Sequence, residues 1–128
     1  MRYLLDTHTF IWFVSELERL PAAVRDIMEA PENEIVFSCA SAWEMAIKVR
    51  LGHLQLPTEF DVFLPNQLAS LGLAILPIEL QHVLGVARLP LLHRDPFDRL
   101  LVCQAQTENI PIISSDPAIS QYGVQVIW

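Results

Sequence analysis

The stretch "HRDPFDRLLVCQAQTENIPIISSD", residues 93–116, contains the clearest helix of the chain, followed directly by a strand. Asp95-Pro96 is typical of an N-cap with proline at the first helical position, and Asp98 in the third position complements the helix dipole. The apolar segment "IPIIS" that follows the helix has the character of a buried strand. This unit predicts an α/β protein, and its acids raise the question of function.

The same alternation of strands and helices runs through the rest of the chain. The strands are rich in Ile, Val and Leu on both faces, which is typical of a parallel sheet covered by helices on both sides. We therefore predict one α/β domain, residues 1–128, with a central parallel sheet of about five strands. Strands are expected within residues 1–6, 34–40, 73–78, 110–114 and 124–128, and helices within 7–15, 15–31, 41–52, 56–72, 79–90 and 95–109.

Composition narrows the class of protein. The chain is 52% hydrophobic with a mean hydropathy of +0.36, which allows a real core and leaves apolar surface for a partner to cover. No apolar run reaches the roughly 18 residues of a membrane span, and Asp6 interrupts the start before a secretory segment could develop, so a cytoplasmic protein is expected. The net charge of -7 argues against a broad basic face for nucleic acid. Cys39 and Cys103 belong to no metal or redox motif and are expected to be free thiols.

Four acids occupy related positions in this scheme. Asp6 ends the first strand, Glu44 lies in the first turn after the second, Asp98 opens the long helix, and Asp116 follows the strand at 110–114. In an open parallel sheet these places are near the carboxyl ends of strands, the edge where such folds bind ligands. The four side chains could therefore converge although they are far apart in sequence.

Each acid also has a purely structural explanation. Ser41 and Glu44 have the spacing of a capping box, Glu44 and Lys48 form a favourable i, i+4 pair, and Asp116-Pro117 repeats the cap at Asp95. Ser, Thr or Asn would cap as well, however, so capping does not explain carboxylates at all four places. Clustered carboxylates repel one another unless a cation shares them, and Mg²⁺ or Mn²⁺ prefers such oxygen ligands. A bound ion of this kind would polarise a phosphate and activate a water for hydrolysis.

With these acids, the chain resembles the PIN-domain ribonucleases, and among them the VapC-like toxins of type II toxin-antitoxin systems. The segment "HRDPFDRLLVCQA" followed by "IISSD" is the specific part, supported by "YLLDTHTFIWF" and "FSCASAWEMAIKVRLGHLQLP". The resemblance implies a single PIN-like domain and Mg²⁺- or Mn²⁺-dependent endonucleolytic cleavage of RNA. It also implies a homodimer that is inhibited by a cognate antitoxin. The acidic quartet that it implies as catalytic residues and metal ligands is Asp6, Glu44, Asp98 and Asp116.

Other polar residues near the acids have supporting or open roles. Asp95 is an accessory acid in this resemblance, while Thr7 and Ser114 are expected to support the acids through hydrogen bonds. For Arg99 and Lys48, substrate contact and structural pairing remain open alternatives. His8 and His93 are expected to be hydrogen-bonded structural residues. The cations considered for RNA or phosphate contacts are Lys48, Arg50, Arg94 and Arg99.

The apolar residues 9–13, "TFIWF", allow two interpretations: a fully buried first helix, or a groove for an antitoxin segment or a second subunit. The helix at 41–52 is predicted to end at Gly52. Its apolar residues on one side are Trp43, Ala46, Ile47 and Leu51.

Two other classes of function fit an acidic α/β domain of this size. A receiver-like phosphoacceptor domain needs a second acid beside Asp6 and a lysine late in the chain, and the sequence has neither; no lysine follows Lys48. A dehalogenase-type phosphatase needs an acid where His8 stands. A non-catalytic interaction module that keeps the fold remains the principal alternative, and binding of a divalent ion discriminates between it and a nuclease.

Overall fold

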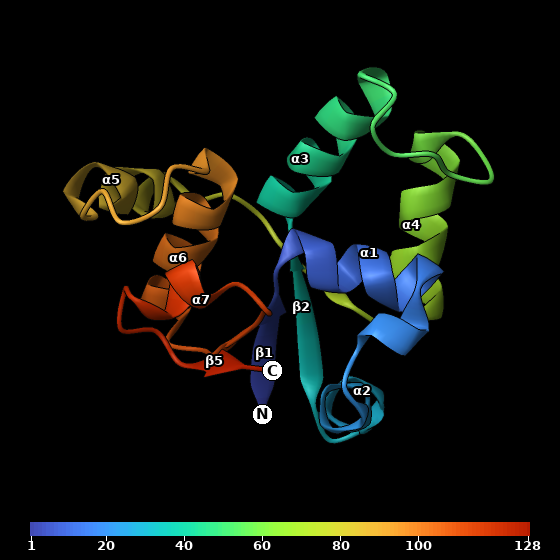
Figure 1. Cartoon of the computed structure of the whole chain (residues 1–128), viewed down its shortest axis with the longest axis horizontal. Helices are drawn as coiled ribbons and strands as arrows, with labels where there is room; N and C mark the ends of the chain where they lie inside the picture. Colours follow the sequence, from blue (N-terminus) through green and yellow to red (C-terminus); the bar gives the residue numbers. More distant parts are fainter.

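The computed structural model describes all residues 1–128, and its five strands form a single sheet (Figure 1). A 3₁₀ turn, Leu17–Arg19, connects the first two helices. The strands and helices, in chain order, are β1 (Arg2–Leu5), α1 (Thr7–Ser15), α2 (Ala22–Glu29), β2 (Glu34–Ser38), α3 (Cys39–Arg50), α4 (Phe60–Ser70), β3 (Ala74–Leu76), α5 (Leu80–Arg88), α6 (Pro96–Glu108), β4 (Ile112–Ile113), α7 (Pro117–Ser120) and β5 (Val126–Ile127).

The sheet is parallel throughout, with the strand order β3-β2-β1-β4-β5. β1 is central, and its Leu4 aligns with Val36 of β2 on one side and with Ile112 of β4 on the other. The chain first adds β2 and β3 on one side of β1 and then reverses to add β4 and β5 on the other. Ligands of open parallel sheets bind where the strand order reverses, outside the carboxyl ends of the strands. That point lies between β1 and β4 here.

The core consists of two apolar clusters, one on each face of the sheet. Successive residues of a strand point to opposite faces, so Leu4 and Leu5 belong to different clusters. The cluster of Leu4 includes side chains from α6 and α7, with α5 packed against it, whereas that of Leu5 includes side chains from α1, α2 and α4. The predicted α/β class, parallel five-stranded sheet and helices on both faces are confirmed.

Helix α3 starts earlier than the sequence indicated. Ser38 is its N-cap, because the Ser38 hydroxyl accepts a hydrogen bond from the Ala40 N–H at 3.0 Å. Ser41 is inside the helix and buried, so the predicted capping box from Ser41 to Glu44 is wrong. Gly52 does end the helical segment and has a φ of 76°, which residues with a side chain rarely adopt.

The predicted apolar stripe of α3 faces mostly outward. Trp43 is 57% exposed and Ile47 38% exposed, and Leu51 just after the helix is also exposed. The side of α3 that contacts the rest of the protein carries Ala40, Met45 and Glu44 instead. This arrangement leaves apolar surface on α3 beside a buried acid.

Residues 9–13 lie largely in the core. Phe10 is buried and packs against Phe37 of β2 with ring centroids 4.6 Å apart, while Ile11, Trp12 and Phe13 are half-buried around the same cluster. Both cysteines are free, as expected; Cys103 is buried, whereas Cys39 is only half-buried. None of the helices has the length and hydropathy that crossing a membrane requires.

Candidate active site

Asp6 lies at the switch point, immediately after β1. It is buried and caps α1, since its Oδ1 accepts a hydrogen bond from the Thr9 N–H at 2.7 Å. Its other oxygen, Oδ2, accepts a hydrogen bond from the hydroxyl of Ser114, just past β4. The expected support of Asp6 by Ser114 is therefore present, and it ties together the ends of the two strands between which the order reverses.

Asp116 belongs to the same hydrogen-bond network, because it also bonds to Ser114. Its backbone N–H donates to the Ser114 hydroxyl at 3.0 Å, and its Oδ1 caps α7 by accepting from the Ala118 N–H at 2.9 Å. Burial acts to raise the pKa of Asp116, but hydrogen bonds from His93 and Ala118 hold that pKa below its usual value. Asp116 is therefore held as a carboxylate.

Asp95 and Asp98, at the start of α6, have different roles: Asp95 caps the helix, and the carboxylate of Asp98 remains free of capping contacts. Asp95 is the cap proper, because its Oδ1 accepts hydrogen bonds from the N–H groups of Phe97 (2.8 Å) and Asp98 (3.4 Å). Asp98 is buried, with 9% of the residue exposed. Burial first, and then the charges of Asp95, Asp6 and Glu44, raise the pKa of Asp98 from 3.8 to about 7. Asp98 therefore holds its proton to a higher pH than an aspartic acid in water does.

Glu44 comes from α3, where it is the sixth helical residue rather than a residue of the first turn. It is buried, and its Oε2 pairs with Lys48 Nζ at 3.1 Å, as the i, i+4 spacing predicted. Its other oxygen, Oε1, is buried and has no hydrogen-bond partner. A buried carboxylate oxygen without a partner is costly, and it indicates a site that a cation would complete.

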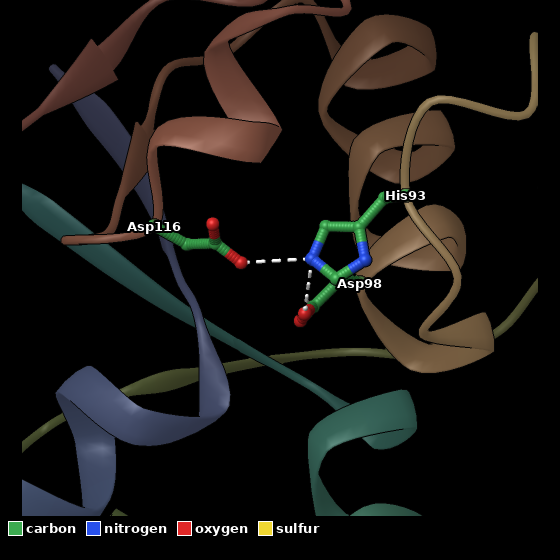
Figure 2. Close-up of side chains that lie close together, drawn as sticks. All are labelled: His93, Asp98 and Asp116. Atoms are coloured by element: carbon green, nitrogen blue, oxygen red, sulfur yellow. Dashed lines mark hydrogen bonds and ion pairs between the residues drawn. The ribbon is translucent and has the colours of Figure 1, made fainter.

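His93 is the residue whose place the sequence did not reveal. Figure 2 shows its imidazole between two acids: Nε2 is 2.8 Å from an oxygen of Asp116 and 3.1 Å from an oxygen of Asp98. Its Nδ1 accepts a hydrogen bond from the Asp95 N–H at 3.1 Å, which directs the Nε2 proton of the neutral ring toward the acids. Burial opposes protonation of His93, but its hydrogen bond to Asp116 and the surrounding negative charges raise its pKa. The expected structural hydrogen bonds exist, but they lie inside the acidic cluster.

The loop that carries His93 is held by two side chains. The hydroxyl of Tyr122 accepts hydrogen bonds from the N–H groups of Leu92 (3.1 Å) and His93 (2.7 Å). Arg99 is 8% exposed, and its guanidinium donates to that hydroxyl and to backbone carbonyl oxygens. Of the two alternatives for Arg99, the structure favours the structural one, because its donors point into the protein. The carbonyls bound by Arg99 are those of Val86, Leu89 and Pro90, at 2.8–3.2 Å.

The remaining expected site residues differ in their placement. The Thr7 hydroxyl donates to Ser41 at 2.9 Å and not to an acid, so its predicted contact with the quartet is not present. Lys48 is partly exposed beside Glu44, and His8 is exposed near Lys48. Arg50 and Arg94 are exposed and form no ion pair.

The donor chemistry of this site fits a hard divalent cation. Burial and the neighbouring carboxylates together raise the pKa of Asp98 to about 7, and Glu44 retains an unpaired buried oxygen. Ligand atoms of His93, Asp98 and Asp116 lie within 4.8 Å of one another. Carboxylates in such numbers suit Mg²⁺ or Mn²⁺ better than a soft ion, which would call for thiolates.

Comparison with known proteins agrees with the fold. A model of the PIN domain family matches residues 3–125. Over 58 residues, the chain is 36% identical to Ribonuclease VapC16 of Mycobacterium tuberculosis, a match that covers 45% of this chain and 41% of that protein. The chain therefore aligns with less than half the length of this curated relative.

Two solved structures have the same fold. One is a structure of VapBC2 from Rickettsia felis bound to a DNA fragment from their promoter, with a TM-score of 0.76, 16% identity, and coverage of 100% of this chain and 99% of that one. The other is VapBC-5 from Mycobacterium tuberculosis, of the VapBC family of toxin-antitoxin systems, with a TM-score of 0.61, 18% identity, and coverage of 98% and 97%. Because the family model spans nearly the whole sequence, the chain belongs to the PIN domain family.

Proposed function

We propose that the chain is a metal-dependent endoribonuclease and that it acts as the toxin of a toxin-antitoxin pair. The observation that carries the proposal is the acidic cluster around Asp98: the charges of Asp6 and Glu44 act on the pKa of Asp98, and ligand atoms of Asp98 and Asp116 lie within 4.8 Å of each other. The ligands of one or two Mg²⁺ or Mn²⁺ ions would be these four carboxylates. Once bound, the ion would supply Lewis-acid activation of a phosphodiester and of the attacking water.

The residues of the chain prepare this site in three ways. Ser114 fixes the orientation of Asp6, and Lys48 holds one oxygen of Glu44 so that the other remains free. The side chains of Asp95 and Asp116 cap α6 and α7 and so define where these two helices begin. Burial and the neighbouring carboxylates penalise the ionised form of Asp98, and a bound cation would relieve that penalty. Because Asp98 must lose its proton to bind the ion, the affinity for the ion should rise with pH.

The proposed partners follow from the resemblance and the exposed surface. The RNA is expected to approach the carboxyl edge, where Arg50, Arg94 and Lys48 remain as candidates for phosphate contacts. A cognate antitoxin is proposed as the inhibitor, and one of the structures with a similar fold is a member of the VapBC family of toxin-antitoxin systems. A homodimer is proposed as the assembled form, since α5 exposes Leu80 and Leu84, which a second subunit would cover. We expect the site of action to be the cytoplasm.

Calorimetric titration with Mn²⁺ tests the proposal directly. We expect saturable binding to the wild type, loss of that binding in Asp98→Asn, and unchanged binding in Asp26→Asn. Asp26 is the matched control, because it is an exposed acid on α2 outside the acidic cluster. Since Asp98 has a pKa of about 7, binding at pH 6.5 should also release protons, seen as a dependence of the measured heat on the buffer.

A folded wild type that binds no Mn²⁺ would reduce the acids to caps and charges and would favour the non-catalytic interaction module. If binding is seen, cleavage is then tested on total RNA, with Asp98→Asn as the inactive control. Total RNA is the appropriate substrate because a selective nuclease would leave an arbitrary oligonucleotide uncut.

A further inference from the structure

An exposed tryptophan adjoins the acidic site. Trp43 on α3 precedes Glu44, and its ring packs edge-to-face on Phe97, which precedes Asp98 on α6, with centroids 4.9 Å apart and planes at 76°. The two aromatic residues thus pair across the same two helices that contribute two of the acids. Phe97 is half-buried, but Trp43 remains 57% exposed, so much of its indole faces solvent.

Few positive charges are exposed near the acidic site, so an aromatic surface there would add affinity for nucleic acid that phosphate contacts cannot supply. The chain has 8 Lys and Arg against 15 Asp and Glu. Of the cations near the acids, Arg99 is buried among carbonyls and Lys48 is paired with Glu44, which leaves Arg50 and Arg94 exposed. Phosphate contacts normally dominate affinity for nucleic acid, and this protein can make few of them.

Stacking of bases on aromatic rings is the main non-ionic source of affinity for unpaired nucleotides. It requires an exposed ring face beside the path of the backbone and tolerates any base, because every base has a π-face. We propose that Trp43, supported by Phe97, is a stacking platform for an unpaired base of the RNA next to the scissile phosphate. This inference rests on the proposed function and names the part of the substrate that the site holds: an unstacked nucleotide.

The same surface could instead be covered by a protein. Ile47, one turn further along α3, is also exposed, and a partner that buries apolar area would contact both residues. The position of Trp43 favours RNA, because its ring packs on Phe97, the residue before Asp98 at the start of α6. Trp43→Leu keeps an apolar side chain but removes the ring, whereas Trp43→Phe keeps a ring, so this pair distinguishes stacking from burial. Ile47→Ala is the control for the general apolar surface.

The test measures the affinity of fluorescein-labelled oligo(U) and oligo(A) of about eight nucleotides, a length within the usual single-strand site size. Fluorescence anisotropy is recorded at low salt with Ca²⁺ in place of Mn²⁺, and a denaturing gel checks that the oligomers stay intact. Homopolymers suffice because stacking is tolerant of sequence. An abasic oligomer of the same length is the matched ligand control, since it keeps the phosphates and loses the bases.

We expect Trp43→Leu to raise the Kd for both homopolymers by roughly 5- to 150-fold, the range for loss of one base–aromatic stack. Trp43→Phe should retain most of the affinity, Ile47→Ala should match the wild type, and the Kd for the abasic oligomer should not depend on Trp43. Mn²⁺ titration of Trp43→Leu should show binding like that of the wild type, which shows that the acids and α6 are undisturbed.

Several outcomes would overturn the proposal: no binding of either homopolymer by the wild type, equal losses in Trp43→Leu and Ile47→Ala, or an equal loss on the abasic oligomer. A change of oligomeric state in Trp43→Leu, measured by sedimentation, would assign the residue to a subunit interface instead. Failure of the proposed function has a different signature, because the wild type would then bind no Mn²⁺ whatever the result with the oligomers.

Discussion

Replacing Asp98 by Asn should stabilise the metal-free protein, and the structure sets the size of the effect. The pKa of Asp98 is about 7 in the folded protein and 3.8 as the reference for the unfolded chain. At about 1.4 kcal/mol for each pKa unit, ionised Asp98 lowers the free energy of unfolding by about 4 kcal/mol. Asparagine removes the charge but also the interaction of Asp98 with the helix dipole, which contributes about 0.3–1 kcal/mol. The expected net gain at pH 8 is therefore about 3 kcal/mol.

The pH dependence has a definite sign. The folded protein holds the Asp98 proton more tightly than the unfolded chain, so the stability that this proton provides is complete below pH 3.8 and is lost as the pH rises through about 7. The advantage of Asp98→Asn should accordingly be small near pH 4, grow up to about pH 7 and then level off. The difference between variant and wild type isolates this effect from the titration of the other acids.

Urea unfolding followed by circular dichroism, in the presence of a chelator and at several pH values, measures this difference. Asp26→Asn is the control and should follow the wild type at every pH. A variant that is less stable than the wild type at pH 8 would refute the reasoning, because it would mean that Asp98 acts chiefly as a helix-stabilising charge. With saturating Mn²⁺, the order should reverse, since only the wild type gains the binding free energy of the ion.

Three further predictions concern the cap of α6, the loop that carries His93, and the two cysteines. Asp95→Ala should lower the free energy of unfolding by about 0.5–2 kcal/mol through loss of the α6 cap, whereas Asp95→Asn, which keeps a capping oxygen, should change it little; equal losses in urea unfolding would contradict this role. Tyr122→Phe leaves the N–H groups of Leu92 and His93 without their acceptor, so hydrogen exchange at these amides should accelerate while that of β1 is unchanged, and stability should fall by about 1–3 kcal/mol. Cys103 should react with a thiol reagent at pH 8 more slowly than the half-buried Cys39, because burial raises the pKa of the Cys103 thiol. Mass spectrometry of the labelled protein identifies the faster site, and faster labelling of Cys103 would show that α6 opens readily.

The sequence by itself determined the elements and the acids. Apolar runs such as that of β1 must be buried on both faces, which requires a parallel sheet covered by helices, and the Asp95-Pro96 and Asp116-Pro117 pairs mark helix starts by local chemistry alone. Acids placed just after strands must then lie near one edge. These conclusions depend on interactions within a few residues, which a sequence displays directly.

Only the tertiary structure decided how side chains from different elements meet. The imidazole of His93 reaches Asp116 across 23 residues of sequence, and Arg99 satisfies carbonyls of a preceding loop. The outward side of α3 could not be predicted either: the helix leaves the sheet at its carboxyl edge, so Trp43 faces solvent while Glu44 turns inward. Such contacts depend on the crossing of elements that are distant in the chain, for which local pattern carries no signal. The burial and the charge repulsion that raise the pKa of Asp98 exist only after that assembly.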